Sequence, residues 1–205
     1  MRHHLILIGF AVAALAAAAI PRPAAAGATS FTVQPGKDTK VVFTSKAPME
    51  TFDGKTHNMT GTVTVDPGAV GDSITVHLEV DLASLDTGKS LRDKHMREEH
   101  LETAKYPKAV FDGAAVLGPA SAKLEPHKDV AFQIEGTFTL HGVTRRLRCD
   151  AVAEYEERGK LGVLAFSAAF PVSLADYSIK RPEFLFLKLA DTQQVKVTGI
   201  AFSTP

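Results

Sequence analysis

The sequence predicts an all-β protein, an antiparallel β-barrel of about eight strands with one short helical insert. Three observations point to this fold class. Apolar and polar residues alternate along several segments, most cleanly in Ser73–Leu82. Turn residues such as Asp66-Pro67-Gly68 separate these segments at intervals of roughly ten residues. A single segment, Arg92–Glu102, has the composition of a helix.

The expected strands follow one another between the turn residues. Most have one apolar and one polar face, as a wall between a core and solvent requires. They are expected at Phe31–Val33, Lys40–Ala47, Ser73–Leu82, Lys108–Leu117, Val130–Leu140, Thr144–Tyr155, Leu161–Phe170 and Gln194–Phe202, with a bent hairpin in Met49–Asp66. The segment Leu174–Leu189 is ambiguous. Closure into a barrel removes the exposed edges that would otherwise promote aggregation.

The helical insert interrupts this series of strands. Arg92–Glu102 contains no glycine, proline or β-branched residue, so its side chains lose little freedom in a helix. Its large apolar side chains are limited to Met96 and Leu101, with Leu91 just before it, which is too few for a core helix. The helix must end before Pro107. We therefore expect a surface helix that acts as a lid or plug over an opening.

The N-terminus has the three-part pattern of a secretory signal peptide. A basic start at Arg2 precedes the apolar run Leu5–Ile20, and small residues follow at Ala24–Ala26. The run is shorter than the roughly 20 residues that span a bilayer. The sequence therefore predicts a cleaved signal peptide at residues 1–26, a single barrel domain at 27–205, a periplasmic location and no membrane-spanning segment after processing.

Charge and cysteine content exclude several classes of protein. The chain has 23 basic and 23 acidic side chains, so its formal net charge of zero gives no electrostatic case for binding nucleic acid. Cys149 is the only cysteine, so no intramolecular disulfide can form. It shares a strand face with Leu147, Ala151 and Ala153. We expect it to be buried and unreactive.

No motif of catalysis or cofactor binding stands out. The chain lacks G-x-S-x-G, a P-loop, G-x-G-x-x-G and C-x-x-C, so we expect neither an enzyme nor a bound cofactor. His95 and His100 are five residues apart, which places them on different helix faces and not in the i, i+4 pair of a zinc helix. The sequence therefore predicts no metal site.

The barrel interior can be read in two ways from the residues alone. Large and small inward residues alternate, and this pattern by itself favours a packed interior. A packed barrel would act through its outer surface, as an envelope stress or interaction protein. In that reading Leu164, Phe166 and Phe170 point outward and supply a homodimer contact.

Four sequence blocks resemble the YceI-like family, in the family's order. They are Ser84–Gly88, Arg92–Met96, Tyr106–Phe111 and the hairpin GTFTLHGVTR at Gly136–Arg145. The resemblance implies an exported, extended lipocalin-like barrel. It further implies a hollow apolar tunnel that binds a polyisoprenoid or another long amphiphile, such as a fatty one.

The resemblance and the inward strand faces together nominate ligand-binding residues. The expected wall contacts are Phe43, Val76, Leu78, Phe111, Phe132, Ile134 and Phe138. Arg92 and His95 would meet a polar head at the mouth, because the guanidinium fork suits a phosphate. The alternative is that Arg92 and Asp93 fasten the insert to the barrel. Lys180 and Arg181 are second candidates for the head, against a solvated surface pair.

The sequence departs from the family in two places. Glu98–Glu102 is more polar than the aromatic segment that usually follows the Arg-Asp block, which affects the inner contacts of the lid. The tail Ala175–Asp191 replaces a short family ending, so it can reshape one end of the tunnel.

Overall fold

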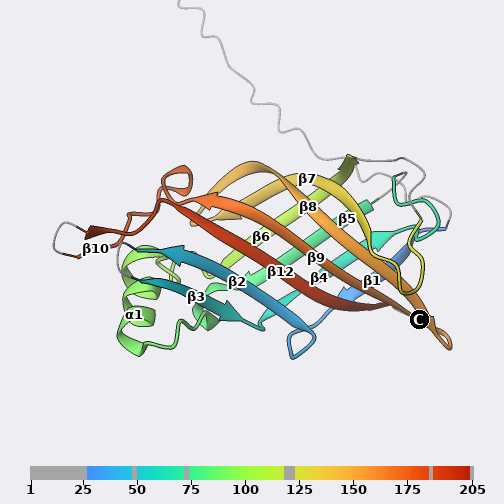
Figure 1. Cartoon of the computed structure of the whole chain (residues 1–205), viewed down its shortest axis with the longest axis horizontal. Coiled ribbons are helices and arrows are strands. Elements are labelled where there is room, and N and C mark those ends of the chain that lie inside the picture. The colour runs from blue at the N-terminus through green and yellow to red at the C-terminus, as the bar shows by residue number, and fades with distance from the viewer. Residues whose placement is uncertain (1–26, 48–49, 72–73, 118–122, 185–186, 204–205) are drawn as a thin grey trace, which may run out of the picture.

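The computed structural model describes residues 27–47, 50–71, 74–117, 123–184 and 187–203 (Figure 1). The predicted signal peptide, residues 1–26, lies outside the described residues and stays a prediction. None of the helices in the described ranges is long and apolar enough to cross a bilayer.

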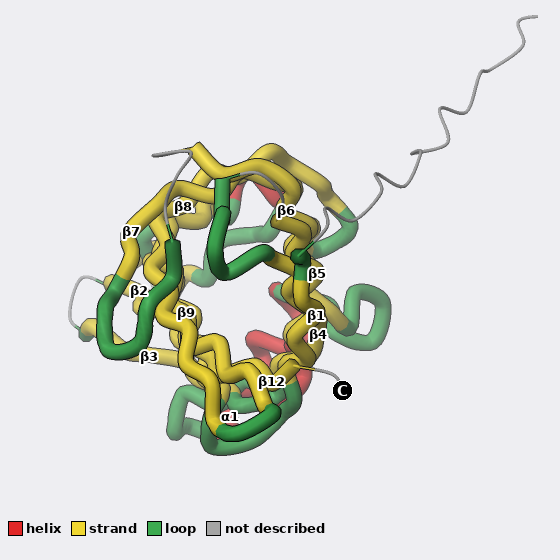
Figure 2. Tube along the Cα trace, turned by 90° about the vertical axis from the view of Figure 1, so that its right-hand side faces the viewer, coloured by secondary structure: helices red, strands yellow, loops and turns green. Residues whose placement is uncertain are grey.

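The protein is an antiparallel barrel, as the sequence predicts. One sheet of ten strands has the order β1-β4-β5-β6-β7-β8-β9-β12-β2-β3, and an additional β1–β12 pairing closes eight of them into a ring (Figure 2). The strands are β1 Thr29–Val33, β2 Thr39–Lys46, β3 Thr51–Thr56, β4 Met59–Val65, β5 Ile74–Asp81, β6 Lys108–Leu117, β7 Val130–Leu140, β8 Val143–Arg158, β9 Leu161–Ser173 and β12 Thr192–Ser203.

Strand β12 has two partners on the same side. Its residues 201–203 pair with β1, and its residues 194–199 pair with β2. The β2–β3 hairpin therefore continues the wall where β1 ends. The prediction of a hairpin within Met49–Asp66 is wrong, because β3 pairs with β2 whereas β4 pairs with β1 and β5. The His57 carbonyl fixes this corner by accepting hydrogen bonds from Gly36 N (3.0 Å) and Thr39 Oγ1 (2.9 Å).

The helical insert lies at one end of the barrel, as expected. It contains a 3₁₀ turn η1 at Leu82–Ser84, the helix α1 at Ser90–His95 and a π-helical turn η2 at Met96–His100. The amide of Leu101 donates to the Met96 carbonyl at 2.8 Å, which is the i→i+5 bond of a π-turn. The tail reaches the same end, where η3 (Ala175–Tyr177), β10 (Glu183–Phe184) and β11 (Leu187–Lys188) lie (Figure 1).

The faces of β9 correct one prediction. Phe166 pairs with Ala153 of β8, and directly paired residues point to the same side of a sheet. Because Ala153 points inward, Phe166 does too, together with Leu164 and Phe170. The proposal that these three side chains form an outer dimer contact is wrong. Strand β9 also continues through Pro171 to Ser173, beyond its predicted end.

Candidate functional site

A cavity of about 1080 Å³ occupies the interior of the barrel. Its wall is almost entirely aliphatic and aromatic, with charged side chains confined to the end that carries the helical insert. The barrel is therefore hollow, and the packed interior favoured by residue alternation alone is wrong. All nine residues nominated from the sequence lie on the lining of this cavity: Phe43, Val76, Leu78, Arg92, His95, Phe111, Phe132, Ile134 and Phe138.

At the end opposite the insert, the lining includes Val70 and Leu124, which come from two loops and are almost fully buried. The amide of Leu124 donates to the Pro67 carbonyl at 2.8 Å, which holds the two loops together. Phe31, a fully buried residue outside the lining, packs edge-on against Tyr155 at 5.9 Å between ring centroids. The polar end of the cavity therefore lies toward α1.

Glycines in the wall keep the cavity open. Gly54 pairs with Phe43 across two strands, and Gly199 pairs with Phe166. A Cβ at either glycine would overlap the ring of its aromatic partner. The rings can therefore lie flat against the wall instead of standing in the lumen. The sequence alone did not reveal these pairs, although a glycine inside an apolar strand is the signal that points to them.

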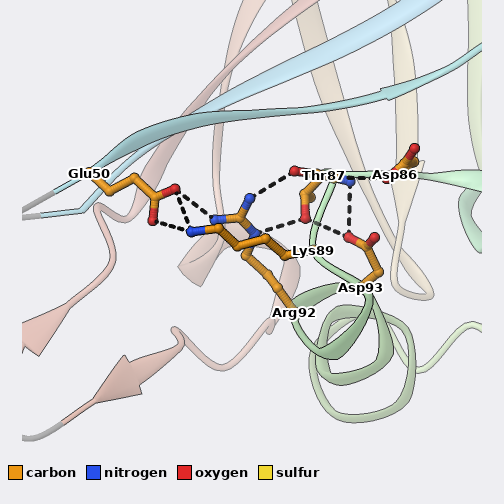
Figure 3. A network of polar contacts seen from close by, with 7 residues as sticks. Glu50, Asp86, Thr87, Lys89, Arg92 and Asp93 are labelled. Carbon is orange, nitrogen blue, oxygen red and sulfur yellow. Dashed lines mark hydrogen bonds and ion pairs between the residues drawn. The ribbon is translucent and has the colours of Figure 1, made fainter.

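Arg92 has protein partners on several sides (Figure 3). Its Nε donates to the Thr87 hydroxyl at 2.7 Å and Nη2 donates to the Thr87 carbonyl at 2.8 Å. Its Nη1 lies 3.3 Å from a carboxylate oxygen of Glu50, and the guanidinium carbon is 3.8 Å from the centroid of the Phe52 ring. These contacts support the reading in which Arg92 fastens the insert to the β2–β3 hairpin.

The neighbouring carboxylates fasten the loop before α1 (Figure 3). Asp93 Oδ1 accepts hydrogen bonds from the Thr87 amide at 2.9 Å and from its hydroxyl at 2.5 Å. Asp86 accepts from the amide of Gly88, whose φ of 79° closes the turn. Hydrogen bonds from Lys89 and then Arg92 lower the pKa of Glu50. The Ser84–Gly88 and Arg92–Met96 blocks thus form one network.

Removing the Asp93 carboxylate should weaken this end of the barrel. Asp93 is only 6% exposed, so Asp93→Ala leaves both Thr87 donors without their partner. We expect a loss of about 1–3 kcal/mol in the free energy of unfolding, measured by urea denaturation. Asp93→Asn keeps one acceptor oxygen and should lose less. Equal stability of wild type and Asp93→Ala would contradict the fastening role.

The tail is attached to the insert through His100. Its Nδ1 lies 3.0 Å from the carbonyl oxygen of Lys180. Burial lowers the pKa of His100, and the hydrogen bond to that carbonyl opposes the effect. Arg181 donates from Nε and Nη2 to the Leu189 carbonyl at 2.9 and 2.6 Å, which fixes the loop of the tail. His95 is half exposed at the mouth, 4.0 Å from Glu99.

His141 joins three segments at the mouth, a junction that was not predicted from the sequence. Its Nε2 lies 2.7 Å from a Glu102 carboxylate oxygen and its Nδ1 lies 3.1 Å from the Tyr177 carbonyl oxygen. Its ring packs against Tyr106, with 4.6 Å between centroids. The predicted His141-Gly142 turn is present, with positive φ at both residues. The hairpin, the insert and the tail are thus connected through one side chain.

One group with metal-ligand chemistry lies outside the cavity. Among the described residues, His127, Glu154 and Glu156 have ligand atoms within 4.8 Å of one another. Glu156 is already bound by the Arg158 guanidinium at 3.0 and 3.2 Å, and Glu154 accepts the His127 amide at 2.7 Å. The hydrogen bond from His127 to Glu154 fastens the loop that carries Leu124 to β8.

The buried thiol of Cys149 should be unreactive in the folded protein. Burial and then the nearby Asp150 raise its pKa to about 11. Because the thiolate is the nucleophile, about one thiol in a thousand is reactive at pH 8. We expect mass spectrometry to show no iodoacetamide adduct at pH 8 until urea unfolds the chain. Rapid labelling of the folded protein would contradict the burial of the Cys149 thiol.

Comparison with known proteins gives consistent matches. A family model described as YceI-like domain matches residues 31–201. A UPF0312 protein of Vibrio parahaemolyticus is 31% identical over 99 residues, which are 48% of this chain and 48% of that protein. A UPF0312 protein of Shewanella sp. is 31% identical over 130 residues, 62% of this chain and 63% of that protein. The chain thus spans about half to just under two thirds of the length of these curated relatives.

Solved structures share the fold. Burkholderia cenocepacia BcnA has a TM-score of 0.64 at 19% identity, over 81% of this chain and 96% of that chain. A polyisoprenoid binding domain from Saccharophagus degradans, described as implicated in plant cell wall breakdown, also has a TM-score of 0.64, at 18% identity over 86% and 99%. At these identities the likeness concerns the fold. The family model covers most of the chain and agrees with the closed barrel, so this protein belongs to the YceI-like family.

Proposed function

We propose that this protein is a periplasmic binding protein that holds a polyisoprenoid or another long-chain amphiphile in its barrel and performs no chemistry on it. The observation that carries the proposal is the apolar cavity of about 1080 Å³ inside the barrel. Pockets for small molecules are typically about 300–1,000 Å³, so this cavity has room for a long chain. The polyisoprenoid binding described for the Saccharophagus degradans domain supports the same ligand class.

The energetics favour an unbranched or prenyl chain over a compact polar ligand. Each buried methylene contributes about 0.8 kcal/mol, so ten of them contribute about 8 kcal/mol before the cost of ordering the chain. Below the mouth the lining offers few polar partners. A polar ligand would therefore lose its hydrogen bonds to water in this part of the cavity without replacing them. The chain should therefore enter the cavity and leave its head near α1.

Native mass spectrometry of protein purified from its own cells tests this function. We expect a population whose mass exceeds that of the polypeptide, and organic extraction should release an amphiphile of the matching mass. The mature polypeptide should begin at Gly27, which the same spectrum reports. A bare polypeptide mass in repeated preparations, together with no uptake of added farnesol or oleyl alcohol, would contradict the proposal.

The packed-barrel alternative receives no support from the fold. It required a filled interior and the outward orientation of Leu164, Phe166 and Phe170, and these side chains line the cavity instead. These three residues therefore provide no outer apolar surface for a homodimer contact.

A further inference from the structure

The charged side chains that line the cavity are not balanced. Among the described residues, four cations and two carboxylates line it, all at the mouth: Lys89, Arg92, Lys180 and Arg181 against Glu50 and Glu99. The lining therefore carries an excess of two positive charges with its histidines neutral, whereas the whole chain has a formal net charge of zero. This excess lies at the end of the cavity where the head of a bound amphiphile would rest.

The two cations of the insert share one carboxylate. Lys89 Nζ lies 3.0 Å and Arg92 Nη1 lies 3.3 Å from Oε1 of Glu50 (Figure 3). Nε and Nη2 of Arg92 donate to the hydroxyl and the carbonyl of Thr87. A cation that already has an anionic partner gains less from a second one. Arg92, which was nominated from the sequence, is therefore the weaker candidate for the head group.

The two cations of the tail have no acidic partner among the side chains that the structure describes. Lys180 is exposed, and Arg181 is only partly exposed. Nε and Nη2 of Arg181 donate to the Leu189 carbonyl, which is a neutral group and leaves the positive charge uncompensated. Glu99, the second carboxylate of the lining, lies 4.0 Å from His95. A cation that is partly withdrawn from water is stabilised by a nearby anion.

Backbone contacts hold these two cations at the rim of the cavity. Ile179, the preceding residue, is buried and lines the cavity, and its amide donates to the Leu174 carbonyl at 2.9 Å. The Lys180 carbonyl lies 3.0 Å from Nδ1 of His100, which ties it to the insert. Two successive cations thus follow directly after a side chain of the apolar wall.

We infer that Lys180 and Arg181 form the head-group site for an amphiphile with an anionic head, a phosphate or a carboxylate. The inference rests on the proposed function and specifies its ligand class. Nη1 of Arg181 has no hydrogen-bond partner among the described residues, so it can donate to an anionic oxygen, and Lys180 supplies a second charge. An alcohol head would leave the excess positive charge of the mouth uncompensated.

Four probes with the same chain test the head preference: oleyl phosphate, sodium oleate, oleyl alcohol and oleylammonium chloride. Delipidated protein is titrated with each probe, and affinity is measured by competition against a fluorescent fatty alcohol. We expect at least one anionic probe to bind about tenfold more tightly than oleyl alcohol, and oleylammonium to bind most weakly. The tighter of the two anions identifies the head as a phosphate or a carboxylate. High salt should reduce the preference, because ions screen exposed charges.

Affinities for both anions no greater than for oleyl alcohol would overturn the inference and leave the proposed function standing. Oleylammonium as the tightest ligand would do the same. If no probe binds, the proposed function fails together with the inference.

Variants locate the preference. The double variant Lys180→Met/Arg181→Met removes both charges, so the ratio of anion to oleyl alcohol affinity should fall to about one while oleyl alcohol still binds. Arg181→Lys keeps the charge and should keep most of the preference. Lys94→Met is the matched control, because Lys94 is an exposed lysine of α1 outside the cavity lining. An unchanged ratio in the double variant, or an equal loss in Lys94→Met, would overturn the assignment.

Discussion

Replacing Ile134 by tryptophan is expected to lower chain uptake at least about tenfold while the fold keeps most of its stability. Ile134 lies near the middle of β7, is buried and lines the cavity. Its Cδ1 approaches Gly113 of β6, where the wall has no side chain. An indole at this position projects into empty volume, so it displaces the ligand instead of overpacking a filled core. Losing the burial of a few methylenes, at about 0.8 kcal/mol each, gives the expected loss.

The control for this variant is Ala131→Trp on the same strand. Ala131 is exposed, so its indole should leave the lumen free and chain uptake unchanged. Binding of oleyl alcohol is measured for both variants, and urea denaturation reports their stability. Unchanged uptake by Ile134→Trp would contradict a bound chain that reaches the level of Ile134 in the cavity.

Regular alternation made most strands predictable from the sequence. Lys108–Leu117 and Val130–Leu140 match β6 and β7 to the residue, because turn-forming residues flank both segments in the sequence. Leu161–Phe170 was harder, since both of its faces are apolar and alternation cannot say which one is inside. Its register against β8 decides the matter, and that register depends on contacts between strands.

Whether the barrel is hollow could not be decided from residue types. The deciding contacts join residues that are far apart in the sequence, such as Phe166 and Gly199. At the mouth, the sequence left two interpretations of Arg92: a contact to a ligand head, or a fastening of the insert together with Asp93. The fastening could be considered from the sequence because its partner Thr87 is only a few residues away.

Gly136→Ala is expected to destabilise the protein by about 3 kcal/mol or more. Gly136 pairs with Gly113, and the register of β6 against β7 shifts just after this pair, between Gly113 and Ala115. A Cβ at Gly136 would lie 2.6 Å from the Gly113 Cα and closer still to the Asp112 carbonyl oxygen. Both are backbone atoms, so relief requires the two strands to separate and their hydrogen bonds to lengthen.

The matched control is Gly159→Ala in the turn between β8 and β9. Gly159 has a φ of 69° and open space around its Cβ position, so only backbone strain opposes the substitution, at a cost of about 1–2 kcal/mol. Urea denaturation of both variants separates strain from the steric conflict between strands. If Gly136→Ala lost no more stability than Gly159→Ala, the two strands would not need their close approach. The glycine of the hairpin block would then need another physical reason.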